Sequence, residues 1–384
     1  MKKAVYTSYG LWQFYYDNGI RCIYPDGKNE ELFGGGLDDF DVTADGEEKI
    51  YMLCQDEKNY FYLYWYDGNC WHNKCMLESS VEEVYNKNFS LVNVGGWLNA
   101  FYTVKHKDST LIVHHIIFGE SEPEIIEKSG DFKSYFALSD KFGNIYCFFA
   151  RGRELGFKKY MWNEKKWSNY TGIFKFNEEI HYITAAFDEN NNYHVAVCIG
   201  EENKYKIAYT NEKKAHEIIS GGYSVLKPVI VINDKINILF DFAGRVLRAV
   251  SDNMGDSFLS AKYFFPGSFN KQGIVKIISA DKTGADIRTN YTYGYETDNG
   301  KLVPSFLEEN IKIEKPKLFE EIKPDIENYI EEEPLLSPPP EYKKEEDGDM
   351  LFKMIAELTK RIDKIEAELC DNREIKIVQE NQPF

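Results

Sequence analysis

The chain has 384 residues, of which 43% are hydrophobic and 15% aromatic, and its formal net charge is −17. Residues 1–307 carry a net charge of −7, and the remaining residues carry −10. Acidic surfaces repel nucleic acid and anionic lipid, so we expect neither as a partner. The hydrophobic fraction is ample for a sizeable core, and the abundant Tyr and Phe favour β-strands.

The N-terminal sequence Met1-Lys2-Lys3 is not followed by an apolar run, and no later apolar run is long enough to span a membrane. We therefore expect no signal peptide, no membrane span and a cytoplasmic location. Display on a spore or cell surface by a signal-independent route stays open. The seven cysteines are scattered and without CxxC spacing, which favours buried free thiols over disulfides.

Two segments share one pattern, in which an aromatic strand runs into a polar turn and ends on a tryptophan. Tyr64 corresponds to Tyr160 and Trp71 to Trp167, and each pair is 96 residues apart, or two steps of 48. One step further along, the tetrapeptide Asn-Glu-Lys-Lys at residues 163–166 recurs at residues 211–214. Strand repeats with a period in the forties are typical of β-propeller blades.

Extending this step divides the body of the chain into units that each hold up to four short strands between Gly, Asn, Asp or Lys turns. The units are roughly 1–36, 37–80, 81–128, 129–176, 177–220, 221–267 and 268–307. We therefore predict an all-β fold, a β-propeller over residues 1–307, with seven blades. Six or eight blades remain open, and a pair of β-sandwiches is the main alternative. A closed ring would remove the exposed edges of these aromatic strands.

The segment from Ser251 to Phe258 reads Ser-Asp-Asn-Met-Gly-Asp-Ser-Phe. It resembles the Asp-box, Ser-x-Asp-x-Gly-x-Thr-Trp, of sialidase-like propellers, with Asn253 at the Asp position, Gly255 at the Gly and Phe258 at the Trp. The resemblance implies a structural turn between the outer strands of a blade, away from any active centre. Residues 1–307 also resemble fucose-lectin-like propellers and uncharacterised propeller proteins of spore-forming bacteria.

Enzymatic activity has little support in the sequence. Sialidase-like enzymes use an arginine cluster, a Tyr–Glu nucleophile pair and an acidic proton donor, and the arginine-bearing motif has no match here, so no catalytic residue is carried over. Other glycosidases need two carboxylates at the right separation. Asp38, Asp39 and Asp41 open a unit where an inner strand would face the central channel, although a solvated turn explains them more simply.

The histidines show no metal-ligand spacing, and the adjacent His114 and His115 must point to opposite faces of a strand. We predict no metal site and no cofactor, since phosphate-binding and nucleophile motifs are also missing from the sequence.

The ligand-binding candidates are Trp97, Asp39, Asp41 and His181. Trp97 follows two glycines and lies outside the repeat register, which makes it the best candidate for an exposed ligand platform. Trp71 and Trp167 are fixed by the repeat, and packing between blades is the preferred interpretation for both.

After Phe306 the composition changes. Residues 308–349 are dominated by Glu, Lys and Pro, which predicts an extended acidic linker. Residues 350–372 predict a coiled-coil helix, and residues 373–384 a flexible tail. The heptad seam, with spacings of 4, 3, 4, 3 and 4, consists of Leu351, Ile355, Leu358, Ile362, Ile365 and Leu369. Leu and Ile at both seam positions leave dimer and trimer open, and the alternative is a helix packed on the propeller.

These features favour a non-catalytic binding protein. In this hypothesis a propeller head binds glycans through its aromatic side chains, and the coiled coil clusters the heads to raise their avidity. One alternative is an intracellular or spore-associated scaffold that binds protein partners. The other is a carbohydrate-active hydrolase with its site in the propeller channel.

Overall fold

The computed structural model describes residues 2–79, 83–119, 122–130, 132–211, 214–264, 272–279, 291–296 and 302–305. The predicted linker, coiled coil and tail, with the whole heptad seam from Leu351 to Leu369, lie outside these residues. Within the described residues the regular secondary structure is β, which confirms the all-β part of the predicted fold. No helix in the described part of the chain is long and apolar enough to cross a membrane.

Five antiparallel sheets follow one another along the chain, four of them with four strands and one with five. The first contains β5 (Gly36–Ala44), β6 (Ile50–Asp56), β7 (Phe61–Tyr66) and β8 (Trp71–Leu77). The second contains β9 (Ser90–Val94), β10 (Trp97–His106), β11 (Ser109–Ile117) and β12 (Glu124–Ser129). The third contains β13 (Tyr135–Ser139), β14 (Ile145–Arg151), β15 (Glu154–Met161) and β16 (Lys166–Trp167), with β17 (Thr171–Lys175) paired to β15.

The fourth sheet contains β18 (Glu179–Phe187), β19 (Tyr193–Glu201), β20 (Lys204–Thr210) and β21 (Ala215–Gly222). The fifth contains β22 (Val229–Ile232), β23 (Ile236–Phe242), β24 (Arg245–Ser251) and β25 (Lys262–Tyr263). A sixth sheet has seven strands, in the order β28 (Leu302–Pro304), β27 (Tyr291–Glu296), β26 (Gln272–Ser279), β1 (Lys2–Thr7), β2 (Gly10–Tyr16), β3 (Ile20–Ile23) and β4 (Asn29–Phe33).

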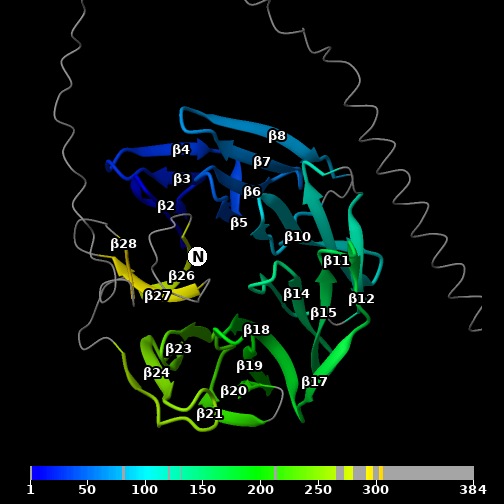
Figure 1. Cartoon of the computed structure of the whole chain (residues 1–384), viewed down its shortest axis with the longest axis vertical. Coiled ribbons are helices and arrows are strands. Elements are labelled where there is room, and N and C mark those ends of the chain that lie inside the picture. Colours follow the sequence, from blue (N-terminus) through cyan, green and yellow to red (C-terminus); the bar gives the residue numbers. More distant parts are fainter. Residues whose placement is uncertain are drawn as a thin grey trace, which may run out of the picture. The chain divides into compact units, whose positions relative to one another are not determined.

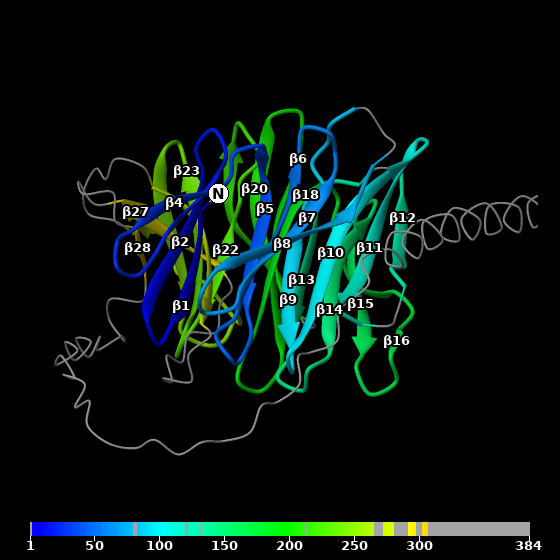
Figure 2. The same ribbon diagram turned by 90° about the horizontal axis from the view of Figure 1, so that it is seen from above.

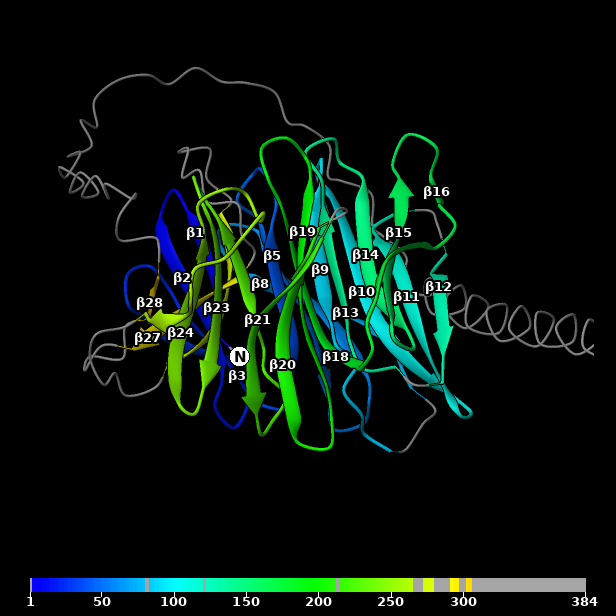
Figure 3. The same ribbon diagram turned by 90° about the horizontal axis from the view of Figure 1, so that it is seen from below.

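The sheets are arranged around a common centre, with the first strand of each of the five sheets innermost (Figure 1). These innermost strands contact one another in chain order, from β5 through β9, β13 and β18 to β22. Edge-on views show the strands running between two faces that carry the hairpins (Figures 2 and 3). This arrangement is typical of a β-propeller.

The buried strands explain the long apolar runs in the sequence. Residues 145–149 of β14 are all buried, and so are residues 193–200 of β19. A strand in the middle of such a sheet is covered on both faces by neighbouring sheets, so it does not alternate between apolar and polar residues. The outer strand β17, by contrast, is mostly exposed.

The first and last groups of strands join into the sixth sheet through a parallel pairing of β1 with β26. The strand groups follow the seven predicted units to within about two residues, and these seven groups form six sheets in the described part of the chain. Strands from the two ends of the folded body are therefore hydrogen-bonded to each other.

A buried ionic cluster lies beside this junction. Lys3 of β1 and Lys276 of β26 are direct partners in the parallel register. The Nζ atom of Lys3 donates to Oδ1 of Asp41 at 2.9 Å, and Nζ of Lys276 donates to Oδ2 of the same carboxylate. The backbone N–H of Leu91, on β9, also donates to Oδ2 at 2.7 Å. The three charged side chains are at most 5% exposed, so one carboxylate ties together strands of three sheets.

This arrangement corrects the interpretation of Asp41 as part of a solvated turn. Burial alone would raise the pKa of Asp41, but the ammonium groups of Lys276 and Lys3 outweigh it and hold the pKa below its ordinary value. The contribution of this carboxylate to stability is therefore present above its unfolded-state pKa. It is lost as the pH falls through the lowered folded-state pKa.

Asp41→Asn should lower the free energy of unfolding by about 3–5 kcal/mol, because two buried ammonium groups would lose their only full counter-charge in the cluster. Urea denaturation at neutral pH measures the effect, and the gap between wild type and variant should narrow in acid. The matched control is Glu201→Gln, which removes the exposed pair with Arg153 and should cost less than about 1 kcal/mol. Equal effects of the two substitutions would contradict the central role of the cluster.

Candidate functional site

A pocket of about 280 Å³ opens where the innermost strands β5, β9 and β13 end. Five strands line it, since β26 and β27 contribute as well. Its polar lining includes Thr43, Ser90, Asn93, Ser139, Lys276 and Tyr291. Lys276 also belongs to the buried ionic cluster, so the groups that join the first and last strands also shape this pocket.

Asn93 is the lining residue with unused hydrogen-bonding capacity. Its Oδ1 atom accepts from the backbone N–H of Gly96 at 3.2 Å, whereas its buried Nδ2 atom has no partner among the described residues. A buried amide donor without an acceptor costs about 1–3 kcal/mol, and a bound polar molecule would remove that cost. A molecule in the pocket would satisfy this amide only if it reached the buried Nδ2 atom.

The hairpin that carries Asn93 also carries Trp97. Val94 pairs with Trp97 across a two-residue loop, and both loop residues, Gly95 and Gly96, have positive φ values of 57° and 84°. Tight hairpin loops of this geometry require glycine or a similarly permissive residue. The two glycines thus fix the tryptophan at the start of β10, beside the pocket end of β9.

Exposed aromatic residues gather at this end of the strands. The side chain of Trp97 is 47% exposed, and its ring lies 6.2 Å from the ring of Trp162, at an angle of 54°. Phe142, in the turn between β13 and β14, is 70% exposed. An added Cβ at the neighbouring Gly143 would lie 3.1 Å from Val94, so that turn rests against the β9–β10 hairpin. Exposed aromatic side chains therefore lie at the same end of these strands as the pocket, but Trp97 and Phe142 are not among its lining residues.

The tryptophans fixed by the repeat lie between sheets instead. Nε1 of Trp71 donates to the hydroxyl of Tyr24 at 2.8 Å, and its ring meets Phe14 edge-on. Trp167 meets the rings of Phe101 and His114, which belong to the β9–β12 sheet. Tyr64 and Tyr160, the equivalent tyrosines of the repeat, are buried. These residues pack one sheet against the next.

The other predicted ligand-binding residues are not brought together with Trp97. Asp39 accepts from Gln55 Nε2 at 3.1 Å and from the backbone N–H of Asn88 at 3.2 Å, so its carboxylate holds the segment before β9. Nε2 of His181 donates to the carbonyl of Gly200 at 2.9 Å, on the adjacent strand. Both side chains, like Asp41, bond within the fold.

The turn at residues 251–258 connects β24 to β25, the outer strands of their sheet. Oδ1 of Asn253 accepts from the hydroxyl of Ser251 at 2.9 Å and from the backbone N–H of Ser257 at 3.0 Å. Gly255 has a φ of 93° and lies against Tyr209, whose ring also contacts Phe258. The turn closes on itself and attaches its sheet to the preceding one, away from the central pocket.

The described lining of the pocket does not contain the pair of carboxylates that acid–base hydrolysis needs. Among the described lining residues, Asp45 is the one carboxylate, and its oxygens accept from the backbone of Glu47 and Lys49 and from the hydroxyl of Tyr51. Glycosidases generally need two carboxylates flanking the scissile bond. The described lining therefore offers one of the two carboxylates that this reaction uses.

Comparison with known proteins finds only distant structural similarity. No protein-family model matches it, and no curated protein sequence matches it significantly. A lectin from Burkholderia pseudomallei, BP39L, is similar in structure with a TM-score of 0.46 and 10% identity, over 65% of this chain and 79% of the lectin.

The fucose-specific lectin from Aleuria aurantia has a TM-score of 0.43 and 13% identity, over 68% of this chain and 94% of the lectin. An ulvan lyase of polysaccharide lyase family PL25 also has a TM-score of 0.43, with 12% identity, over 69% of this chain and 80% of the lyase.

Two tryptophan substitutions distinguish an exposed tryptophan, Trp97, from one that packs between sheets, Trp71. Trp97→Ala should change the free energy of unfolding by less than about 1 kcal/mol, because much of this side chain is already in water. Trp71→Ala should cost about 2–3 kcal/mol, since it removes an inter-sheet hydrogen bond and half-buried aromatic contacts. Both are measured by urea denaturation, and a larger loss for Trp97→Ala would contradict the assignment.

Proposed function

We propose that this protein is a non-catalytic carbohydrate-binding protein whose site is the central pocket together with the aromatic hairpin at Trp97. The observation that carries the proposal is the pairing of an unsatisfied buried donor, Nδ2 of Asn93, with an exposed tryptophan on the same two-residue hairpin. Sugars combine hydroxyl groups with apolar C–H faces, and a polar pocket beside an aromatic ring complements both.

The size of the pocket favours a single sugar unit or the end of a chain. Ligand pockets span roughly 300–1,000 Å³, and the volume here, about 280 Å³, lies just below that range. Larger glycans would extend from the pocket across the exposed rings of Trp97 and Phe142.

The charges of the lining favour a neutral ligand. Its ammonium group, on Lys276, already bonds Asp41 and the carbonyl of Leu91, and its carboxylate, on Asp45, is bound within its own turn. A phosphate or another multiply charged anion would find the ammonium of Lys276 already paired and would be repelled by the carboxylate of Asp45. Hydroxyl groups need only the partial charges that Thr43, Ser90, Asn93 and Ser139 offer.

We further propose that several copies of the propeller are clustered in one assembly. The heptad pattern at residues 350–372 favours pairing of this segment with its own copies, as a dimer or trimer. A shallow sugar site binds weakly. Several propellers joined through their acidic linkers to one coiled coil would bind a glycan surface with higher avidity, without any new contact.

The experiment is a glycan array probed with the intact chain and with variants. Trp97→Ala and Asn93→Asp should each weaken binding to the best glycan by at least about tenfold; Asp keeps the acceptor for Gly96 but removes the donor. The control is Tyr223→Ala, which removes an aromatic side chain that is 88% exposed but lies at a different pocket. The proposal fails if the folded wild-type chain binds no glycan, or if Tyr223→Ala weakens binding as much as Trp97→Ala.

Truncation to residues 1–307 tests the clustering separately. Binding to a dense glycan surface should fall by roughly 10²-fold or more, while the affinity for a soluble monovalent sugar should stay the same. Sedimentation of the two proteins gives their masses. Unchanged retention on the dense surface would contradict the clustered arrangement but leave the single site in place.

A protein-interaction scaffold is the second candidate, and one surface feature favours it. Tyr223 and Val225 are exposed at a pocket of about 410 Å³, formed by residues 221–227, the β23–β24 turn and the start of β26. Exposed tyrosines beside a hollow are frequent anchors of protein interfaces. If the array is silent, partners recovered with the wild-type chain and lost with Tyr223→Ala would support this function.

A further inference from the structure

The hairpin between β7 and β8 carries a group of three potential metal ligands. Tyr66 and Trp71 are paired across its loop, which consists of residues 67–70. Oδ1 of Asp67 accepts from the backbone N–H groups of Asn69 at 2.9 Å and Cys70 at 3.0 Å. Gly68 has a φ of 100°, which lets the chain reverse inside this Asp-capped turn. The turn uses one carboxylate oxygen and leaves the other, Oδ2, directed at β8.

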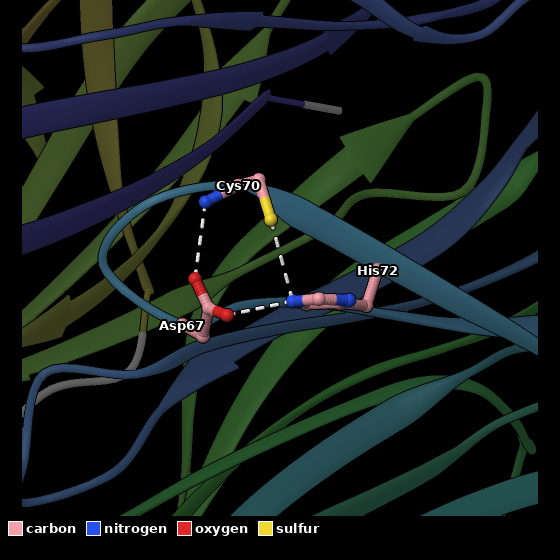
Figure 4. A group of neighbouring side chains, drawn as sticks. All are labelled: Asp67, Cys70 and His72. Atoms are coloured by element: carbon pink, nitrogen blue, oxygen red, sulfur yellow. Dashed lines mark hydrogen bonds and ion pairs between the residues drawn. The ribbon is translucent and has the colours of Figure 1, made fainter.

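Three different donor atoms converge at this point. Oδ2 of Asp67 lies 2.6 Å from Nε2 of His72, and Sγ of Cys70 lies 3.4 Å from the same nitrogen. All three atoms are within 4.8 Å of one another. Figure 4 shows the sulfur and the carboxylate both directed at this one nitrogen of the ring.

Stacking against Trp65 fixes the orientation of the His72 imidazole. His72 is the direct cross-strand partner of Trp65, and the two rings are stacked with centroids 5.3 Å apart and an interplanar angle of 19°. Trp65 in turn meets Phe118, which follows β11 of the neighbouring sheet, edge-on at 6.1 Å. A ring held in this way presents Nε2 to the loop without further ordering.

The geometry argues against a nucleophilic Cys–His–Asp triad. In such a triad the acid orients one ring nitrogen while the other takes the proton of the nucleophile. Here the thiol and the carboxylate both face Nε2, and one nitrogen cannot donate to the carboxylate while it accepts from the thiol. Convergence of sulfur, nitrogen and oxygen on one point is instead typical of a metal-ligand set.

We propose that Asp67, Cys70 and His72 bind a zinc ion. Zn²⁺ takes thiolate, imidazole and carboxylate ligands at about 2.0–2.3 Å in tetrahedral geometry, which places the donor atoms about 3.2–3.8 Å apart. The 3.4 Å between Cys70 and His72 lies in that range, whereas the 2.6 Å between Asp67 and His72 would have to widen by about 0.6 Å on metal binding. A thiolate and an imidazole favour Zn²⁺ over Mg²⁺ or Ca²⁺, which prefer oxygen ligands.

Asp67 and Cys70 are exposed, so the fourth coordination position would face solvent. This hairpin includes β8, the outermost strand of its sheet, whereas the central pocket is lined by innermost strands (Figure 1). The metal site is therefore independent of the proposed carbohydrate site. It also departs from the prediction of no metal site, which rested on the spacing of histidines alone.

Metal binding is measured on the full chain by titration with Zn²⁺, and with Co²⁺ as a spectroscopic probe. Cys370 lies outside the described residues, so every protein in the series carries Cys370→Ser. We expect one Zn²⁺ per chain and a thiolate-to-cobalt charge-transfer absorption. Cys70→Ser and His72→Gln should weaken Zn²⁺ binding by at least about 10–100-fold, the loss seen when only an outer-shell partner is removed.

Two further variants make the result decisive. Cys75→Ser removes the half-buried free thiol on the same strand and should leave binding unchanged. Asp67→Asn keeps an oxygen for the turn but places an amide at the ligand position, so it should weaken binding while the chain still unfolds near the wild-type temperature. The absence of stoichiometric Zn²⁺ binding would overturn the proposal. Equal losses in Cys70→Ser and Cys75→Ser would overturn it as well.

Discussion

The fold depends on the junction between its first and last strands. β1 pairs in parallel with β26, and the paired Lys3 and Lys276 share the carboxylate of Asp41. Two ammonium groups side by side in the core would repel each other, so the carboxylate on β5 is required for the strands to meet in this register. Because Asp41 also accepts from the backbone of Leu91, the same group ties the junction to β9. Strands β1, β5, β9 and β26 are thereby all bonded to one carboxylate.

The central pocket is a consequence of this junction. Lys276 is shared between the cluster and the pocket lining, and β9 brings both Leu91 into the cluster and Asn93 into the pocket. Aromatic residues then divide into two roles that the repeat distinguishes. Those in register, such as Trp71 and Trp167, fill the space between sheets. Trp97, outside the register, remains exposed at the start of β10, and this difference directs the functional proposal to that end of the strands.

The sequence predicts much of the fold because its information is local and repeated. The period near 48 residues gives the grouping of strands, and Gly95-Gly96 gives a tight loop. The sequence does not reveal the pairing of β1 with β26, since this contact joins residues more than 270 positions apart. For the same reason Asp41 resembles a solvated turn residue until Lys3 and Lys276 are placed beside it. The Asp67–Cys70–His72 group is missed because two of its residues lie in a hairpin loop and one on β8, and because they belong to three residue types.

The most direct test of the carbohydrate-binding account is a crystal structure of the chain with the sugar that binds best on the array. The account predicts the sugar in the central pocket, with hydrogen bonds to Asn93 and Ser139 and with one face against Trp97. A sugar seated elsewhere, for example beside Tyr223 or between two neighbouring sheets, would contradict the assigned site. A folded chain that binds no sugar at all would contradict the function itself.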